Sequence, residues 1–367
     1  MNSKGPKLKI GLIGCGKVAR EHHLPTLARI SSAEVVAVAD LCAARMNLPE
    51  LRTPRIKKYR TAGELLADPL VEAVGVLTDT PSHYAIGLAA LQAGKHVFME
   101  KPLALSRQEC DEFVDAGRTS GKKTMVCFNL RWHRLILQAR KIISSGRLGS
   151  IKAIRSTYTH FRDGGDAPDW HRKLCFGGGV TFNESIHHID LWRYLLKQEI
   201  KEVFAFHTSS AAYEDETSIV GARLSAGTLA TVTNTFQTSP TSEIEILGAK
   251  GRLLVRLYQF DGLRFYSHDE YPGSLPVRIR GILQAFRQGA DSLPALTRGG
   301  GFGETFYHAW NHFIDCVLSD KQPECSLDDG RQGVLVTLAA IQSFRTKQLV
   351  AVNGDNRLPC RQTSQLP

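Results

Sequence analysis

Short apolar runs alternate with helix-like segments over the first third of the chain. The segments 82–93 and 106–120 have helical patterns and are short enough to connect parallel strands. Because parallel strands need such crossover connections, this alternation indicates a doubly wound parallel sheet, and we predict an α/β domain over residues 1–128. The expected strands are 9–13, 34–39, 73–77, 96–99 and 123–128.

The pattern changes near residue 151 to longer strands that follow one another directly, with turns at Gly227 and Gly248. Consecutive alternating strands favour an antiparallel sheet, so residues 129–355 are expected to form an α+β domain with a large, mostly antiparallel open sheet. An open sheet face is a surface for assembly into a homodimer or homotetramer. The expected strands are 151–161, 201–208, 217–225, 228–238 and 243–247, and the expected helices are 129–145, 184–197, 303–319 and 328–347.

Two segments carry weaker patterns. Residues 267–303 contain Pro272, Pro276 and Pro294 and are predicted to be a loop or a partly helical insertion. Residues 356–367 are expected to form a loose tail.

Composition excludes several classes of protein. The chain has 367 residues, 43% of them hydrophobic, and a formal net charge of +10. Its basic residues are spread rather than clustered, which argues against nucleic-acid binding, although a positive field suits an anionic cofactor or an anionic substrate. No apolar run has the length of a membrane helix or a secretory signal, and the eight cysteines lack paired spacing. A cytoplasmic protein without membrane contact is expected.

A glycine turn follows the first apolar run. Gly14, Gly16 and Ala19 form a G-x-G-x-x-A pattern that opens a helical segment, and Asp40 ends the next strand. The glycines allow a backbone to approach a pyrophosphate, and a carboxylate at this distance meets ribose hydroxyls. Asp40 would repel a 2′-phosphate, which favours NAD over NADP, whereas Arg45 keeps NADP open.

The strand 96–99 runs into Glu100, Lys101 and Pro102. Ligands of open parallel sheets bind at the carboxyl ends of the strands, which is where Lys101 would project. Proline restricts the backbone of the residue before it and permits a cis peptide bond, so the direction of the ammonium group would be fixed. The alternative is a solvated lysine at a strand end.

Two long motifs resemble the glucose-fructose oxidoreductase and inositol dehydrogenase family, also called Gfo/Idh/MocA. The segment Gly94–Pro102, which follows Thr80–His83, is similar to the family's Glu-Lys-Pro motif. The segment Gly177–Asp190 resembles the family's G-G-G-x-x-x-D-x-G-x-H-x-x-D. The resemblance covers nearly the whole chain and implies a Rossmann domain, a second domain with an open sheet, and hydride exchange with sugars, polyols or sugar nucleotides.

The resemblance implies that Lys101 and His187 are the catalytic pair. Asn183 stands where the family often has Asp, and Ser185 replaces the usual Gly. The implied cofactor contacts are Gly14, Cys15, Gly16, Lys17, Val18, Asp40, Thr80, Pro81, His83, Glu100, Lys101 and Asn129. The implied substrate contacts are Lys101, Arg131, Trp170, Arg172, Asn183 and His187.

The spacing of the second motif is consistent with these roles. Asn183, His187 and Asp190 lie at i, i+4 and i+7, on one face if the segment is helical. An imidazole can take a proton from a substrate hydroxyl near neutral pH, and an ammonium can stabilise the developing alkoxide. Adjacent histidines diverge on a helix, so His187 and His188 do not predict a metal site.

The sequence thus predicts an NAD-dependent oxidoreductase acting on a secondary hydroxyl of a sugar, sugar nucleotide or cyclic polyol. One alternative is a redox-assisted glycosidase or lyase that retains its NAD through each cycle. Another is a nucleotide-bound sensor or scaffold without catalysis.

Overall fold

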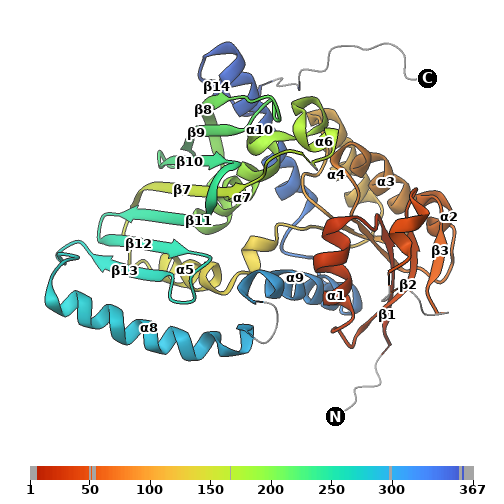
Figure 1. Cartoon of the computed structure of the whole chain (residues 1–367), viewed down its shortest axis with the longest axis horizontal. Coiled ribbons are helices and arrows are strands. Elements are labelled where there is room, and N and C mark those ends of the chain that lie inside the picture. The colour runs from red at the N-terminus through yellow and green to blue at the C-terminus, as the bar shows by residue number, and fades with distance from the viewer. Residues whose placement is uncertain are drawn as a thin grey trace. The chain divides into compact units, whose positions relative to one another are not determined.

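The computed structural model of the protein describes residues 6–48, 51, 55–165, 167–296, 300–354 and 358. The chain forms two compact units, which are labelled by their elements in Figure 1. The first unit is Met1–Asn129 with Thr305–Gln332, and the second is Leu130–Glu304 with Gly333–Pro367.

A six-stranded parallel sheet forms the centre of the first unit, in the spatial order β3-β2-β1-β4-β5-β6. The predicted doubly wound sheet is therefore confirmed. Its strands are β1 (Leu8–Ile13), β2 (Ala33–Ala39), β3 (Lys57–Tyr59), β4 (Ala73–Val76), β5 (His96–Met99) and β6 (Thr124–Val126). The strand order reverses between β1 and β4, and ligands of such sheets bind outside the carboxyl ends of the strands at this point.

Helical segments connect these strands. Two of them, α2 and α4, begin with a residue whose hydroxyl accepts from the backbone N–H of a glutamate three residues later, while the carboxylate of that glutamate accepts from the backbone N–H of the first residue. The pairs are Thr61 with Glu64 and Ser106 with Glu109. Such capping boxes satisfy amide groups that a helix end leaves unpaired. The helical segments are η1 (Ala19–His23), α1 (Leu24–Leu27), η2 (Ala43–Met46), α2 (Ala62–Leu66), α3 (Thr80–Gln92) and α4 (Arg107–Thr119).

The first unit also includes residues from late in the chain, which the sequence analysis had assigned to the second domain. These residues form most of α9 (Gly300–Leu318) and the start of α10 (Leu327–Thr346). Trp310 of α9 is fully buried and stacks on Phe98 of β5, with 3.9 Å between the ring centroids. Aromatic packing against β5 therefore holds this late helix to the first unit.

An eight-stranded sheet forms the centre of the second unit, in the order β13-β12-β11-β7-β10-β9-β8-β14. The β7–β10 pair is parallel and the other neighbouring strands are antiparallel. This confirms the predicted mostly antiparallel sheet. The strands are β7 (Ile151–Phe161), β8 (Ile200–Thr208), β9 (Thr217–Leu224), β10 (Leu229–Thr235), β11 (Gln237–Gly248), β12 (Gly251–Arg256), β13 (Leu263–Ser267) and β14 (Val350–Ala351).

Helix α7 packs against this sheet. Trp192 of α7 is fully buried, and its indole N–H donates to the hydroxyl oxygen of Ser156 on β7 at 2.9 Å. The helical segments here are η4 (Asn129–Trp132), α5 (Arg134–Ser144), α6 (Asp169–Arg172), η5 (Leu174–Phe176), η6 (Thr181–Ser185), α7 (Ile186–Leu196) and α8 (Leu275–Leu296).

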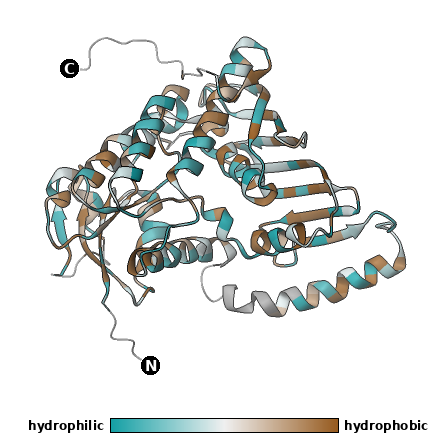
Figure 2. Cartoon of the chain, turned by 180° about the vertical axis from the view of Figure 1, so that it is seen from behind, coloured by the Kyte–Doolittle hydropathy of each residue, from teal (hydrophilic) through white to brown (hydrophobic). Residues whose placement is uncertain are grey.

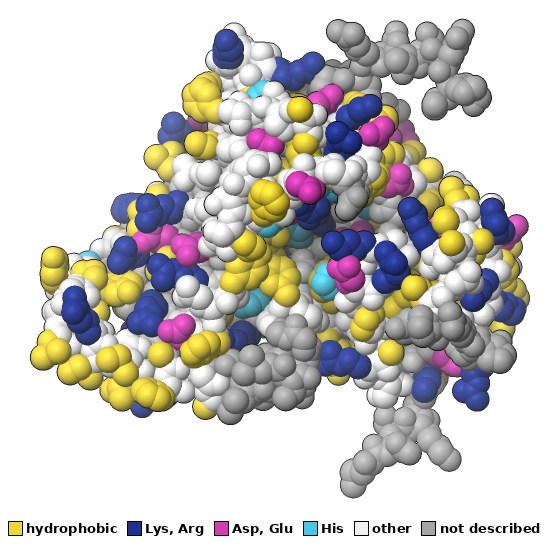
Figure 3. All heavy atoms as spheres, viewed as in Figure 1, with side chains coloured by type: hydrophobic (Ala, Val, Ile, Leu, Met, Phe, Trp, Pro, Cys, Tyr) yellow, Lys and Arg dark blue, Asp and Glu magenta, His cyan; other side chains and the backbone are white. Residues whose placement is uncertain are grey.

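The predicted insertion at 267–303 contains the 22-residue helix α8. Hydrophobic residues at helical spacing are exposed on it, among them Leu275, Ile279 and Phe286. Figure 2 shows that hydrophobic and hydrophilic residues alternate along α8, and Figure 3 shows hydrophobic side chains on its surface. Pro276 is compatible with this helix, because it lies in the first turn, where no amide hydrogen is needed.

None of the described helices is long and apolar enough to cross a membrane. The predicted tail, residues 356–367, lies outside the described residues except for Leu358.

Candidate functional site

The turn after β1 leaves room for an anionic ligand. Gly14 has a φ of +95°, and a Cβ there would lie 2.7 Å from the carbonyl oxygen of Leu77, so this position requires glycine. A Cβ on Gly16 would meet no atom within 4 Å. A continuous helical segment begins at Lys17, and its first amide groups have no partner within the helix. Open space beside a helix start fits the pyrophosphate of a dinucleotide.

Asp40 follows β2, and two backbone amides hold its carboxylate. The N–H groups of Cys15 and Cys42 each donate to it at 2.8 Å. The guanidinium of Arg45 lies 3.9 Å from the same carboxylate and is largely exposed. Asp40 is thereby fixed beside the glycine turn, where it can accept hydrogen bonds from ribose hydroxyls but would repel a 2′-phosphate.

A buried glutamate, Glu100, directly follows β5 and belongs to a chain of hydrogen bonds. The indole N–H of Trp310 donates to Nδ1 of His23 at 2.9 Å, and Nε2 of His23 lies 3.0 Å from Oε1 of Glu100. Since the indole can only donate, Nδ1 accepts and Nε2 donates to Glu100. Burial raises the pKa of Glu100, but the hydrogen bond from His23 and the neighbouring Lys101 outweigh it, and the pKa falls to about 2. Lys101, which is partly exposed, therefore follows a carboxylate that stays ionised.

The backbone after Lys101 is braced by His83 of α3. Nδ1 of His83 lies 2.7 Å from the carbonyl oxygen of Pro102, and Nε2 lies 3.1 Å from that of Thr78. The Lys101–Pro102 peptide bond is cis. Burial lowers the pKa of His83, although both hydrogen bonds oppose this. The His83 ring therefore holds the backbone segment after β4 to the backbone segment after β5.

The remaining predicted cofactor contacts of the first unit lie along the same edge of the sheet or next to it. Thr80 and Pro81 form the first turn of α3, and Asn129 donates from Nδ2 to the hydroxyl of Thr305 at 2.9 Å. Parallel strands end at the same edge, which brings together the glycine turn, Asp40 and Lys101. Among the described residues, no group of three or more His, Cys, Asp and Glu side chains could hold a metal ion.

In the second unit, the helical segment that carries Asn183 and His187 has a buried carboxyl at its start. Asp215 accepts from the backbone N–H of Thr181 at 2.7 Å, and its own carbonyl accepts from Val180 at 3.0 Å. Burial raises the pKa of Asp215 to about 7, although the hydrogen bonds from Thr181 lower it. Asp215 thus fixes the N-terminus of the helix that positions the candidate residues.

Asn183 lies in a buried hydrogen-bond cluster. Its Nδ2 lies 2.8 Å from Nε2 of His171, and Nη1 of Arg162 lies 2.8 Å from the same nitrogen. The neighbouring Glu184 is also buried, with Oε1 at 3.4 Å from Nη2 of Arg162. The triple glycine holds His171 close, because a Cβ on Gly178 would lie 2.5 Å from the His171 carbonyl oxygen.

Strand β7 and Arg162, the residue directly after it, supply the other side chains around this cluster. Tyr158, His160 and Arg162 are two residues apart, so they point to the same face. Nε2 of His160 lies 3.6 Å from Oε1 of Glu184, and the ring of Tyr158 stands edge-on to that of His187 at 6.2 Å. The sequence analysis did not assign Tyr158, His160 or Glu184 to the site, although the alternation of Tyr, His and Arg along the strand was a usable signal.

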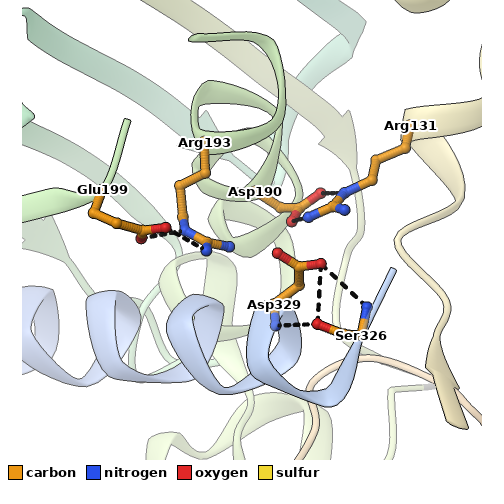
Figure 4. A network of polar contacts seen from close by, with 6 residues as sticks. All are labelled: Arg131, Asp190, Arg193, Glu199, Ser326 and Asp329. Atoms are coloured by element: carbon orange, nitrogen blue, oxygen red, sulfur yellow. Dashed lines mark hydrogen bonds and ion pairs between the residues drawn. The ribbon is translucent and has the colours of Figure 1, made fainter. Parts of the chain in front are cut away.

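Arg131, predicted to contact substrate, is paired with Asp190 (Figure 4). Its Nε donates to Asp190 Oδ2 at 2.7 Å, and Nη2 donates to Oδ1. Both side chains are at most 5% exposed. Figure 4 also shows Arg193 of the same helix bound to Glu199, which is 52% exposed. The Arg131 pair anchors α7 to η4, which carries Arg131.

The other two predicted substrate contacts lie on α6. Arg172 donates from Nε to the carbonyl oxygen of Ala212 at 2.9 Å, and Trp170 is half-buried beside His171. The contacts of the three cations near this helix go to different groups: Arg162 to His171, Arg172 to the carbonyl of Ala212, and Lys173 to Asp169. Lys101 belongs to the first unit and His187 to the second.

Comparisons with known proteins cover both units. A model described as an oxidoreductase family with an NAD-binding Rossmann fold matches residues 8–128, and a GFO/IDH/MocA C-terminal domain matches residues 136–254. Myo-inositol 2-dehydrogenase of Thermotoga maritima is 26% identical over 353 residues, covering 94% of this chain and 98% of that protein. The 1,5-anhydro-D-fructose reductase of Ensifer adhaerens is 30% identical over 251 residues, covering 67% of this chain and 75% of the reductase.

Solved structures share the fold. The WlbA dehydrogenase of Bordetella pertussis, crystallised with NADH and UDP-GlcNAcA, matches with a TM-score of 0.81 at 23% identity. The match covers 95% of this chain and 99% of that one. It shows the same architecture in both units.

Proposed function

Because the chain belongs to the oxidoreductase family that joins an NAD-binding Rossmann domain to a GFO/IDH/MocA C-terminal domain, we propose that it interconverts a secondary hydroxyl and a ketone on a sugar, sugar nucleotide or cyclic polyol. The inositol dehydrogenase and anhydrofructose reductase that it resembles support this substrate class. The observation that carries the proposal is the common edge of β1, β2 and β5, which bears the open glycine turn, Asp40 and Lys101.

The first unit would hold the cofactor. The open backbone at Gly16 would receive the pyrophosphate, and Asp40 would accept hydrogen bonds from the ribose. Bound NAD would supply the hydride acceptor, or as NADH the hydride donor.

The remaining chemistry falls to side chains of the protein. His187 would take the proton of the substrate hydroxyl during oxidation and return it during reduction. The ammonium group of Lys101 would stabilise negative charge on the substrate oxygen, and Asn183 would orient that hydroxyl or the imidazole. Glu100, ionised and buried, would keep the ammonium in place.

The test is a comparison of Lys101→Ala and His187→Ala with the exposed control Lys141→Ala. Turnover should be lost in the first two variants and kept in the control, while nucleotide binding measured by fluorescence titration stays near the wild-type value in all three. Full turnover in either site variant would refute the assigned role.

The same assay separates the alternatives. Product formed without added oxidant, together with NAD released only on denaturation, would indicate a redox-assisted glycosidase or lyase. Nucleotide binding without turnover on any substrate would indicate a sensor or scaffold.

We also propose that the protein acts in the cytoplasm as a homodimer or homotetramer. Phe206 and Ile219 are register partners on β8 and β9, and both are exposed, which supports assembly through the sheet face. The cysteines among the described residues are free, which suits a reducing compartment. Sedimentation of the Ile219→Lys variant tests the assembly, because this variant should form a smaller assembly than the wild-type protein does.

A further inference from the structure

The hydrogen-bond roles at His171 are determined by its partners. Nη1 of Arg162 and Nδ2 of Asn183 both lie 2.8 Å from Nε2 of His171. A guanidinium group has donors and no acceptor, so Nε2 must accept, and the ring hydrogen lies on Nδ1. Asn183 therefore turns its amide nitrogen toward His171, because an amide oxygen would face an accepting nitrogen.

Glu184 imposes the same orientation from a second side. Its Oε1 lies 3.4 Å from Nη2 of Arg162 and 3.5 Å from Nδ2 of Asn183. A flipped amide would bring its oxygen against this carboxyl oxygen as well as against Nε2 of His171. Asn183, His171 and Glu184 are each at most 5% exposed, so water would compensate little for the lost hydrogen bonds.

Arg162 is held in place although its side chain is 42% exposed. It follows directly after β7, and its backbone N–H donates to the carbonyl oxygen of Phe236 at 2.8 Å. Its guanidinium carbon lies 5.4 Å from the centre of the Phe236 ring. Backbone pairing and a cation–π contact thus direct this side chain toward His171.

We propose that Arg162 and His171 are positioning residues that orient the Asn183 amide so that Oδ1 serves the substrate side as a hydrogen-bond acceptor. This rests on the proposed function. A carboxylate, which the related motif often has at this place, presents acceptors whichever way it turns, whereas an amide presents an acceptor only in one of its two orientations. The Arg162–His171 pair lets an asparagine act here as an aspartate would.

The kinetic test compares Arg162→Met in two backgrounds. In the wild-type background, loss of Arg162 lets His171 move its hydrogen to Nε2, which favours the flipped amide and leaves the more distant Glu184 alone to oppose the flip. The value of kcat should therefore fall by about tenfold to 100-fold, because one hydrogen bond near developing charge is lost or replaced by a repulsion, while KM changes little. In the Asn183→Asp background, orientation no longer matters and the aspartate benefits from an Nε2–H on His171. Arg162→Met should therefore leave kcat there unchanged or raise it. An equal loss in both backgrounds would overturn the proposal.

Two further variants serve as controls. Arg162→Lys keeps a group that only donates and should recover most of the lost kcat. Arg155→Met makes the same type of substitution on β7. Because Arg155 pairs with Glu245 on the opposite face of the strand, this variant should keep the wild-type kcat. Loss of activity in Arg155→Met equal to that in Arg162→Met would assign the effect to the strand and overturn the proposal.

A second measurement does not depend on turnover. Nuclear magnetic resonance of isotope-labelled histidine in the wild-type protein should show His171 with its hydrogen on Nδ1. A ring with its hydrogen on Nε2 would overturn the proposal even in an active enzyme. If no sugar or polyol is turned over, the proposed function fails, and the tautomer still decides whether Arg162 and His171 orient Asn183.

Discussion

Replacing Asp190 by Asn should destabilise the second unit more than most single substitutions do. Asp190 is 1% exposed and makes two hydrogen bonds with Arg131, which is 5% exposed. Removing one charge of such a pair leaves the other buried without compensation, which costs about 3–5 kcal/mol. The matched control is Glu199→Gln, because Glu199 pairs with Arg193 of the same helix but is 52% exposed, and such pairs contribute about 0–1 kcal/mol.

Urea unfolding followed by tryptophan fluorescence measures both losses. Trp192 lies two residues from Asp190 on α7 and is fully buried, so unfolding of this part of the second unit changes its contribution to the emission of the four tryptophans. Replacing both partners, in Arg131→Met with Asp190→Leu, should cost no more than Asp190→Asn alone, because no unpaired charge remains. Equal small losses in Asp190→Asn and Glu199→Gln would refute the reasoning, as would additive losses at Arg131 and Asp190.

Two other changes test the helix cap and the glycine turn. The pKa of Asp215 is raised from 3.8 to about 7, so its contribution to stability is full below about pH 4 and is lost as the pH rises through 7. Asp215→Asn keeps an acceptor for Thr181 and should remove this pH dependence of stability, which amounts to about 4 kcal/mol at ~1.36 kcal/mol per pKa unit. Urea unfolding at several pH values measures it, and an unchanged pH profile would contradict the assignment. Gly14→Ala should destabilise the first unit by about 1–3 kcal/mol, because residue 14 has a positive φ and a Cβ there would contact Leu77. Gly16→Ala should leave the melting temperature unchanged but weaken nucleotide binding at least about tenfold. Normal nucleotide affinity in Gly16→Ala would show that the pyrophosphate binds elsewhere.

The elements with strong periodicity could be predicted from sequence. Strand β7 was predicted with its observed bounds, and β5 likewise, because their apolar residues define the pattern without help from neighbours. Strands β3, β12 and β13 were not predicted. β3 has the sequence Lys-Lys-Tyr, and β12 has arginine at positions 252 and 256, so their pairing with neighbouring strands decides their structure rather than local preference.

The division of the chain could not be read from local patterns. Trp310 and Phe313 look like ordinary core residues of an amphipathic helix, and nothing in their spacing shows that they pack on Phe98, more than 200 residues earlier. The contacts of Arg131 were equally hidden, since its pairing with Asp190 is a product of tertiary structure.

The motifs around Gly14, Asp40, Lys101, Asn183 and His187 were visible because each has a fixed spacing. The residues that orient them were less visible. His171 and Arg162 are ordinary residues in sequence, and their contact with Asn183 arises because β7, α6 and η6 come together. Sequence thus indicates which groups could do chemistry, whereas the structure shows which groups contact them.

The most direct test of the central claim is the absorbance of reduced nicotinamide when the protein is mixed with NAD and free sugars, cyclic polyols, uronic acids or nucleotide sugars in turn. The account predicts a rise with one of these classes, a weaker rise when NADP replaces NAD, and none with the His187→Ala variant. A protein that binds NAD but reduces it with no member of the panel would contradict the claim.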